Sequence, residues 1–165
     1  MKSKKITLGL LIFYLVVLTW IIVFKMQFAF SNLPELRSIN LIPFGGSLIV
    51  NGGISFSEII KNILAFIPFG ILISVLWDKK TFIKKFLPII LTSFIFETLQ
   101  FVFGIGASDI TDIVSNSLGG VIGIIITVVI SKIFKNNWQK IINIISLIGC
   151  IILTLFIAML ILANL

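Results

Sequence analysis

The chain has 165 residues, of which 59% are hydrophobic and only 12% are charged. A soluble globular domain is about half apolar and about a quarter charged, so too few charges remain here to cover a surface that faces water. This composition argues against a soluble domain and predicts a single integral membrane domain over residues 1–165.

The charge and the missing residue types exclude several kinds of partner and site. The net charge is +7, which in a membrane protein reflects lysines in cytoplasmic loops, so we expect no nucleic-acid partner. The chain contains no histidine, which is the usual general base and the commonest transition-metal ligand. Its single cysteine, Cys150, excludes an intrachain disulfide.

Five apolar stretches predict an all-α, polytopic transmembrane helix bundle, because about 20 apolar residues span a bilayer as a helix. They are Ile6–Phe24, Asn62–Trp77, Phe86–Phe103, Ile113–Ile130 and Ile141–Leu162. The first follows lysines as a signal peptide does, but it is too long for a signal core and no cleavage site follows, so we expect a retained helix. The second is short and contains Pro68, which predicts a kink or a break.

The placement of the lysines predicts the orientation of the bundle. Three segments that share one side hold ten lysines, whereas the other side holds only Lys25, Arg37 and Lys61. The ten are Lys2, Lys4, Lys5, Lys79, Lys80, Lys84, Lys85, Lys132, Lys135 and Lys140. Because basic residues concentrate in cytoplasmic loops, we expect the N-terminus inside and the C-terminus outside the plasma membrane.

The longest segment between two predicted helices runs from Lys25 to Lys61, on the outer side. It is too apolar for a free loop and contains the glycine pairs Gly45–Gly46 and Gly52–Gly53. Backbone outside a helix must be buried in protein or face water at membrane depth. We therefore expect this segment to lie in the membrane interface or to re-enter the bundle.

Glu97 lies near the middle of the third stretch. A carboxylate at that depth costs at least a few kcal/mol unless it is paired, protonated or hydrated, and such residues are commonly functional. Ser93 and Gln100 lie four residues before and three after it, so all three share one helix face. The alternative is a purely structural role, in which a protonated Glu97 holds neighbouring helices together.

A second polar group has its members at helical spacing, so they form one stripe on the fourth stretch. Its members are Asp109, Asp112, Asn116, Gly119, Gly120 and Gly123. The two acids could cap the helix and complement its dipole. Capping explains one acid readily, but not two acids with an asparagine one turn deeper. The glycines are expected to pack this helix closely against another.

These polar residues are expected to converge in the outer half of the membrane. The predicted binding residues are Arg37, Asn40, Asn62, Glu97, Gln100, Asp109, Asp112 and Asn116. Glu97, Asp109 and Asp112 are also the candidate catalytic residues. The sequence requires no cofactor, but carboxylates are ligands for hard cations, so these three would hold Mg²⁺ or Ca²⁺ if one is bound.

Four short motifs follow one another across about residues 37–126. They are Asn40–Phe44, Asn62 with Phe66–Gly70, Glu97–Gln100, and Asp109–Asp112 with Asn116–Gly119. In this order they resemble the VanZ-like family of small bacterial membrane proteins, named after a member associated with resistance to the glycopeptide teicoplanin. Many members have an arginine shortly before the first acid of the last motif. Here Gly106–Ser108 stands at that place, so the role of that arginine is not carried over, and Arg37 is the candidate to supply it.

The resemblance implies a cell-envelope function at the outer face. We favour a non-catalytic protein that binds an amphiphile, such as a cell-wall lipid precursor or a lipoglycopeptide, in the outer polar pocket and so contributes to teicoplanin resistance. The alternatives are an intramembrane enzyme that acts on a lipid-linked or phosphorylated substrate through Glu97, Asp109 and Asp112, and a lipid transporter or flippase. A transporter would require a homo-oligomer, because no internal repeat is visible. Membrane lipids are the expected partners in every case.

Overall fold

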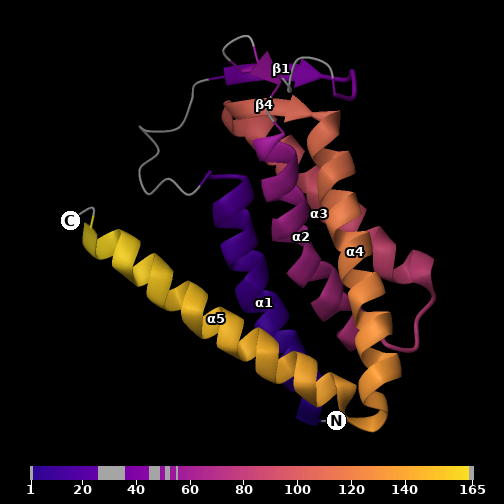
Figure 1. Cartoon of the computed structure of the whole chain (residues 1–165). Coiled ribbons are helices and arrows are strands. Elements are labelled where there is room, and N and C mark those ends of the chain that lie inside the picture. The colour runs from indigo at the N-terminus through magenta and orange to yellow at the C-terminus, as the bar shows by residue number, and fades with distance from the viewer. Residues whose placement is uncertain (1, 26–35, 45–48, 51–52, 55, 164–165) are drawn as a thin grey trace.

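The computed structural model describes residues 2–25, 36–44, 49–50, 53–54 and 56–163. These residues form an all-α bundle with small strands at one end (Figure 1). The helices are α1 (Lys2–Ile22), α2 (Ser57–Leu76), α3 (Phe82–Phe103), α4 (Ile110–Phe134) and α5 (Trp138–Ala163), with a short 3-10 helix, η3 (Lys135–Asn137), between the last two.

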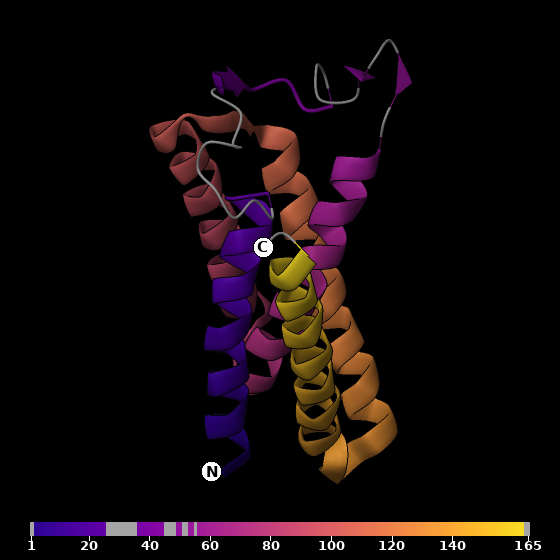
Figure 2. The same ribbon diagram turned by 90° about the vertical axis from the view of Figure 1, so that its left-hand side faces the viewer.

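Four helical stretches within the described residues are long and apolar enough to cross a membrane. They are Lys4–Ile22, Ser57–Leu76, Phe82–Phe103 and the 54-residue stretch Ile110–Ala163, which comprises α4, η3 and α5. The predicted all-α membrane bundle is therefore confirmed. That α4 and α5 cross separately, and that the N-terminus lies inside, stay predictions. In Figure 1, α5 slants away from the bundle toward the C-terminus, and in the turned view of Figure 2 it lies in front of the other helices.

The second helix is longer than predicted and has no break at Pro68, whereas the alternative of a kink there stays a prediction. It begins at Ser57 rather than Asn62, has 20 residues, and continues through Pro68 as one α-helix. The charged residues Glu58 and Lys61 lie in its first turns, which is why an apolar pattern alone places its start too late. A proline removes one backbone hydrogen bond, but Phe66 and Phe69 on either side of it are fully buried and hold the helix in place.

Two pairs of strands lie across one end of the bundle (Figure 1). β1 (Leu36–Asn40) pairs in parallel with β4 (Ile105–Asp109), and β2 (Ile49–Val50) pairs antiparallel with β3 (Gly53–Ile54). Gly104 ends α3 in the left-handed conformation, with φ of 66°, which glycine adopts without strain. The described strands of the segment between α1 and α2 therefore pair across the helix ends and do not pass between the helices.

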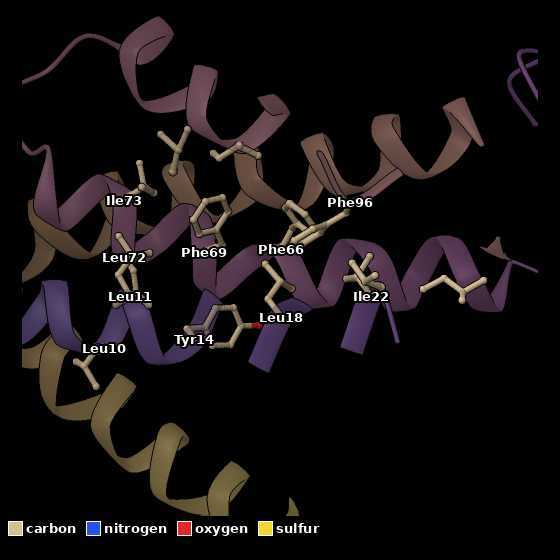
Figure 3. Packing of buried hydrophobic residues seen from close by; sticks show 14 residues of the cluster. Leu10, Leu11, Tyr14, Leu18, Ile22, Phe66, Phe69, Leu72, Ile73 and Phe96 are labelled. Atoms are coloured by element: carbon tan, nitrogen blue, oxygen red, sulfur yellow. The ribbon is translucent and has the colours of Figure 1, made fainter. Parts of the chain in front are cut away.

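The apolar core lies where α1, α2 and α3 meet (Figure 3). Phe66 of α2 makes edge-to-face contacts with Phe69 and with Phe96 of α3, at centroid distances of 5.9 and 6.2 Å. Leu18 of α1 packs into the same cluster and is fully buried. The hydroxyl of Tyr14 donates a 2.7 Å hydrogen bond to the carbonyl of Ala65, so α1 is also held to α2 by a polar contact.

The contact between α2 and α4 is formed by glycines, namely Gly70, Gly119, Gly120 and Gly123. A Cβ added to Gly119 would overlap the carbonyl oxygen of Ile63, and one added to Gly123 would overlap that of Ile67. Both obstacles are backbone atoms, which cannot rotate away. The backbones of the two helices can therefore approach this closely only because these residues carry no side chain.

The segments that carry the ten lysines lie at the end of the bundle opposite β1 and β4 (Figure 1). Asp78, in the turn between α2 and α3, joins three elements there: it accepts hydrogen bonds from Lys4 of α1 at 2.8 Å and from Gln139 of α5 at 3.0 Å. Partial burial raises the pKa of Asp78, but these bonds and one from the backbone amide of Lys79 outweigh it and hold the pKa below its ordinary value.

Candidate functional site

Glu97 lies at the junction of α3 and β4. The turn at Gly104 folds β4 back along the last turns of α3, so the backbone amide of Asp109 donates a 2.9 Å hydrogen bond to Glu97 Oε2. The hydroxyl of Ser108 donates to the backbone carbonyl of Glu97 at 2.6 Å. Glu97 is only 4% exposed. Its second oxygen, Oε1, is buried without a hydrogen-bond partner among the described residues.

Asp109 ends β4 and is the N-cap of α4. Its Oδ1 accepts a 2.7 Å hydrogen bond from the amide of Thr111, and its Oδ2 accepts one of 3.0 Å from the side chain of Asn40 in β1. The amide of Phe44 in turn donates to the hydroxyl of Thr111. The capping role considered for this acid is therefore present in the structure, and the same carboxylate also attaches β1 to the start of α4.

Asp112 faces a different neighbourhood from Asp109. Its Oδ1 accepts a 2.8 Å hydrogen bond from Asn62 of α2, and it lines a cavity of about 390 Å³ whose walls come from α1, α2, α3 and α4. The polar residues of this mixed-charge cavity are Lys25, Glu58, Lys61, Asn62, Gln100 and Asp112. Gln100 is fixed at its edge by a 2.9 Å hydrogen bond to the carbonyl of Ile22.

Asn116 lies one turn deeper on α4 and is fully buried. Its amide donates a 2.9 Å hydrogen bond to the hydroxyl of Ser93, one turn before Glu97 on α3. Its carbonyl oxygen has no partner among the residues that the structure describes. Buried polar atoms are nearly always satisfied in proteins, because an unmade hydrogen bond costs about 1–3 kcal/mol. Asn116 and Glu97 thus each present one free acceptor inside the bundle.

The predicted site residues therefore lie at one end of the bundle, in three neighbourhoods. The first contains Glu97, Asp109 and Asn40. The second contains Asp112, Asn62 and Gln100. The third contains Asn116 and Ser93. These assignments follow from the hydrogen bonds and cavity linings given above. The backbone of Arg37 pairs with Gly106 in the β1–β4 ladder, and its side chain lies outside the described part of the chain.

Sequence reasoning missed three residues of the mixed-charge cavity: Lys25, Glu58 and Lys61. The lysines entered the prediction only as charges that flank helices, and Glu58 was not considered. A helix that begins at Ser57 contains both Glu58 and Lys61. Glu58 then lies one turn before Asn62 and Lys61 lies one residue before it, and this proximity was a usable signal for both.

The geometry does not assemble the three acids into a cation site. Within the described residues, no group of three or more histidine, cysteine, aspartate or glutamate side chains is placed to hold a metal ion. Asp109 is engaged by Thr111 and by Asn40 of β1, whereas Asp112 is engaged by Asn62 of α2. The structure thus gives no support to Mg²⁺ or Ca²⁺ binding by Glu97, Asp109 and Asp112 together.

Comparison with known proteins places the chain among relatives. A family model described as VanZ/LLP1 matches residues 11–135, which covers all the residues of the three neighbourhoods. Protein VanZ of Enterococcus faecium is 36% identical over 155 residues, covering 93% of this chain and 91% of that protein. No solved structure matches the chain.

Proposed function

This chain belongs to the VanZ-like family, and from that premise we propose that it is a cell-envelope protein that lowers susceptibility to lipoglycopeptides such as teicoplanin. It does so by binding an amphiphile, either the drug itself or a lipid-linked cell-wall precursor, at the polar end of the bundle on the outer side of the membrane. The observation that carries this proposal is the mixed-charge cavity beside Asp112.

The cavity offers both signs of charge to a head group. The ammonium groups of Lys25 and Lys61 suit a phosphate or carboxylate, while the carboxylates of Glu58 and Asp112 suit an amine or hydroxyl. Its remaining walls are apolar and come from Ile21, Ile22 and Leu64. A ligand with polar groups at one end and hydrocarbon beside them matches this lining better than a fully polar solute does.

A second cavity supports the amphiphilic character of the ligand. It has a volume of about 510 Å³, is almost wholly apolar, and lies between α1, α2 and α5 beside Tyr14, Pro68 and Leu72. On α2, Pro68 follows Leu64 of the first cavity by four residues, so the two positions share one face about 6 Å apart along the helix. The two cavities therefore have lining residues on the same face of α2, one turn apart.

Binding fits the carboxylates of the site better than catalysis does. The Asp112 carboxylate is held by Asn62, and the Asp109 carboxylate is held by Thr111 and Asn40. Each therefore serves as a positioned hydrogen-bond acceptor. An enzymatic role retains one observation in its favour, the buried and unpartnered oxygen of Glu97. If Glu97→Gln abolished resistance but left drug binding at the cell surface unchanged, that result would favour the enzyme.

The proposal is tested by expressing the full chain in a teicoplanin-susceptible host that has no family member. We expect the inhibitory concentration of teicoplanin to rise and the binding of labelled drug at the surface to change. Asp112→Asn, which keeps the shape of the side chain, should remove most of this effect, as should Lys61→Gln. Asp78→Asn and Lys132→Gln make the same chemical changes at the other end of the bundle and serve as matched controls.

All variants are compared at equal abundance in the membrane, measured by an epitope tag. Wild-type resistance in both cavity variants would overturn the role of the cavity. An unchanged inhibitory concentration with the wild-type protein, together with unchanged surface binding of the drug, would overturn the proposal as a whole.

A further inference from the structure

A third cavity lies at the opposite end of the molecule, in the turn between α2 and α3. Its volume is about 360 Å³, and it is lined by Trp77, Lys80, Lys84, Leu87, Pro88 and Leu91. None of these residues belongs to the mixed-charge cavity, and none matches a motif singled out in the sequence. Whatever this cavity binds is therefore independent of the function proposed above.

The two lysines of this cavity have no counter-charge. Asp78 is the one acidic residue between α2 and α3, and it is already engaged: Lys4 pairs with its carboxylate at 2.8 Å, and Lys85 bonds its carbonyl at 3.3 Å. The ammonium groups of Lys80 and Lys84 are exposed, and neither has a hydrogen-bond partner or ion pair among the described residues. The cavity is thus lined by the apolar stems of two lysines whose positive charges are unpaired.

The first turn of α3 adds to this positive character. Its N-cap, Thr81, makes no side-chain capping hydrogen bond, and the turn contains no acidic residue. The first amides of a helix lack acceptors within the helix, and its N-terminus attracts anions. Lys80 precedes the N-cap of α3 by one residue and Lys84 lies in its first turn. The two lysines therefore flank a helix start that favours an anion such as a phosphate.

The wall below the lysines is apolar. Leu87 and Leu91 follow Lys84 by three and seven residues, so they continue along one face of α3 for about 10 Å, and both are half exposed. Trp77 stands on the α2 side, and tryptophan is enriched at the boundary between lipid head groups and hydrocarbon. A soluble anion would leave this wall unused, whereas a lipid would cover it.

We propose that this cavity binds an anionic glycerophospholipid. Its phosphate lies between Lys80 and Lys84, and one acyl chain runs along Leu87 and Leu91. Lysines close to the membrane surface strengthen binding to anionic lipid by about fivefold each. Loss of both lysines should then weaken binding by about 20- to 30-fold.

The test uses the full-length protein in an uncharged detergent, with binding followed by native mass spectrometry. Phosphatidylglycerol, phosphatidylcholine and soluble glycerol phosphate are the three probes. We expect tight binding of phosphatidylglycerol alone, and a 20- to 30-fold loss in the double variant Lys80→Gln/Lys84→Gln. The matched control is Lys132→Gln/Lys140→Gln, which removes two exposed lysines from the same end and should change the affinity by less than about twofold.

Three results would overturn the proposal. An equal loss in both double variants would show a general attraction to basic charge and no defined site. Equal binding of phosphatidylcholine would remove the role of the head-group charge. Binding of glycerol phosphate as tight as that of the lipid would show an anion site without an acyl chain. Resistance to teicoplanin does not enter this test, so either proposal can fail without the other.

Discussion

Replacing Gly123 by alanine tests the close contact between α2 and α4. The new methyl group would overlap the backbone carbonyl of Ile67, which cannot move aside without shifting α2. Overpacking of this kind costs about 1–3 kcal/mol. At about 2–4 °C per kcal/mol for a chain of this size, the melting temperature should fall by about 2–12 °C. Thermal unfolding in detergent, followed by circular dichroism or by loss of the monodisperse peak, measures the change.

The matched control is Gly149→Ala in α5, where no described atom lies within 4 Å of the added methyl group apart from its chain neighbours and the nearby backbone of the same helix. Alanine is the better helix former, by about 0.5–1 kcal/mol, so this variant should melt at the wild-type temperature or slightly above it. The two substitutions are chemically identical and should act in opposite directions. If Gly123→Ala also melted at or above the wild-type temperature, α2 and α4 would not be in the contact described.

Three further predictions concern polar contacts. Asp109→Ala removes the N-cap of α4 and should cost about 0.5–2 kcal/mol in an unfolding assay, whereas Asp109→Asn, which can still cap, should cost less. Thr7→Val removes the 2.9 Å hydrogen bond to Asn143 and should cost about 0.6–1.7 kcal/mol; a double-mutant cycle with Asn143→Leu should show that the two losses are not additive. Asp78 has a lowered pKa in the folded protein. Its stabilisation is therefore full above the ordinary aspartate pKa of about 3.9 and is lost as the pH falls through the lower folded value. Between pH 7 and pH 3 the melting temperature should fall less steeply for Asp78→Asn than for the wild type.

The helices could be predicted from the sequence because each one presents a long apolar stretch, and this signal is local. Their ends were placed less well. The starts of α2 and α3 lie five and four residues before the predicted ones, because Glu58, Lys61 and Lys84 interrupt the apolar pattern without interrupting the helix. Charged residues at a helix end can extend into the head-group region, so hydropathy marks the hydrocarbon core and not the helix.

The β1–β4 ladder could not be predicted in the same way. Asn40 and Asp109 are 69 residues apart in the chain, and each strand has only five residues rich in small or polar side chains. Neither segment alternates apolar and polar residues strongly enough to indicate a strand. The pairing depends on the helices between the strands, which bring the two segments to the same end of the bundle.

For the site, the position of each residue along its helix predicted where the polar side chains gather, but not which neighbouring element each side chain faces. The expectation that the polar residues converge agrees with the positions of Asn62, Asp109 and Asp112 near the β1–β4 end. It could not show that Asp109 turns toward β1 while Asp112 turns toward α2, because that depends on how α4 is rotated against its neighbours. The rotation is set by the glycine contact with α2, which sequence alone suggests without naming the partner helix.

The parallel pairing of β1 with β4 also has a consequence for biogenesis. β1 leaves the ribosome before α2 and α3 have been made, and it cannot find its partner until β4 has followed them. During that interval Asn40 lacks the carboxylate that it binds in the finished protein. The polar end is therefore completed only after α3 has been inserted, and a chain truncated after α3 would insert its helices without forming the cap over them.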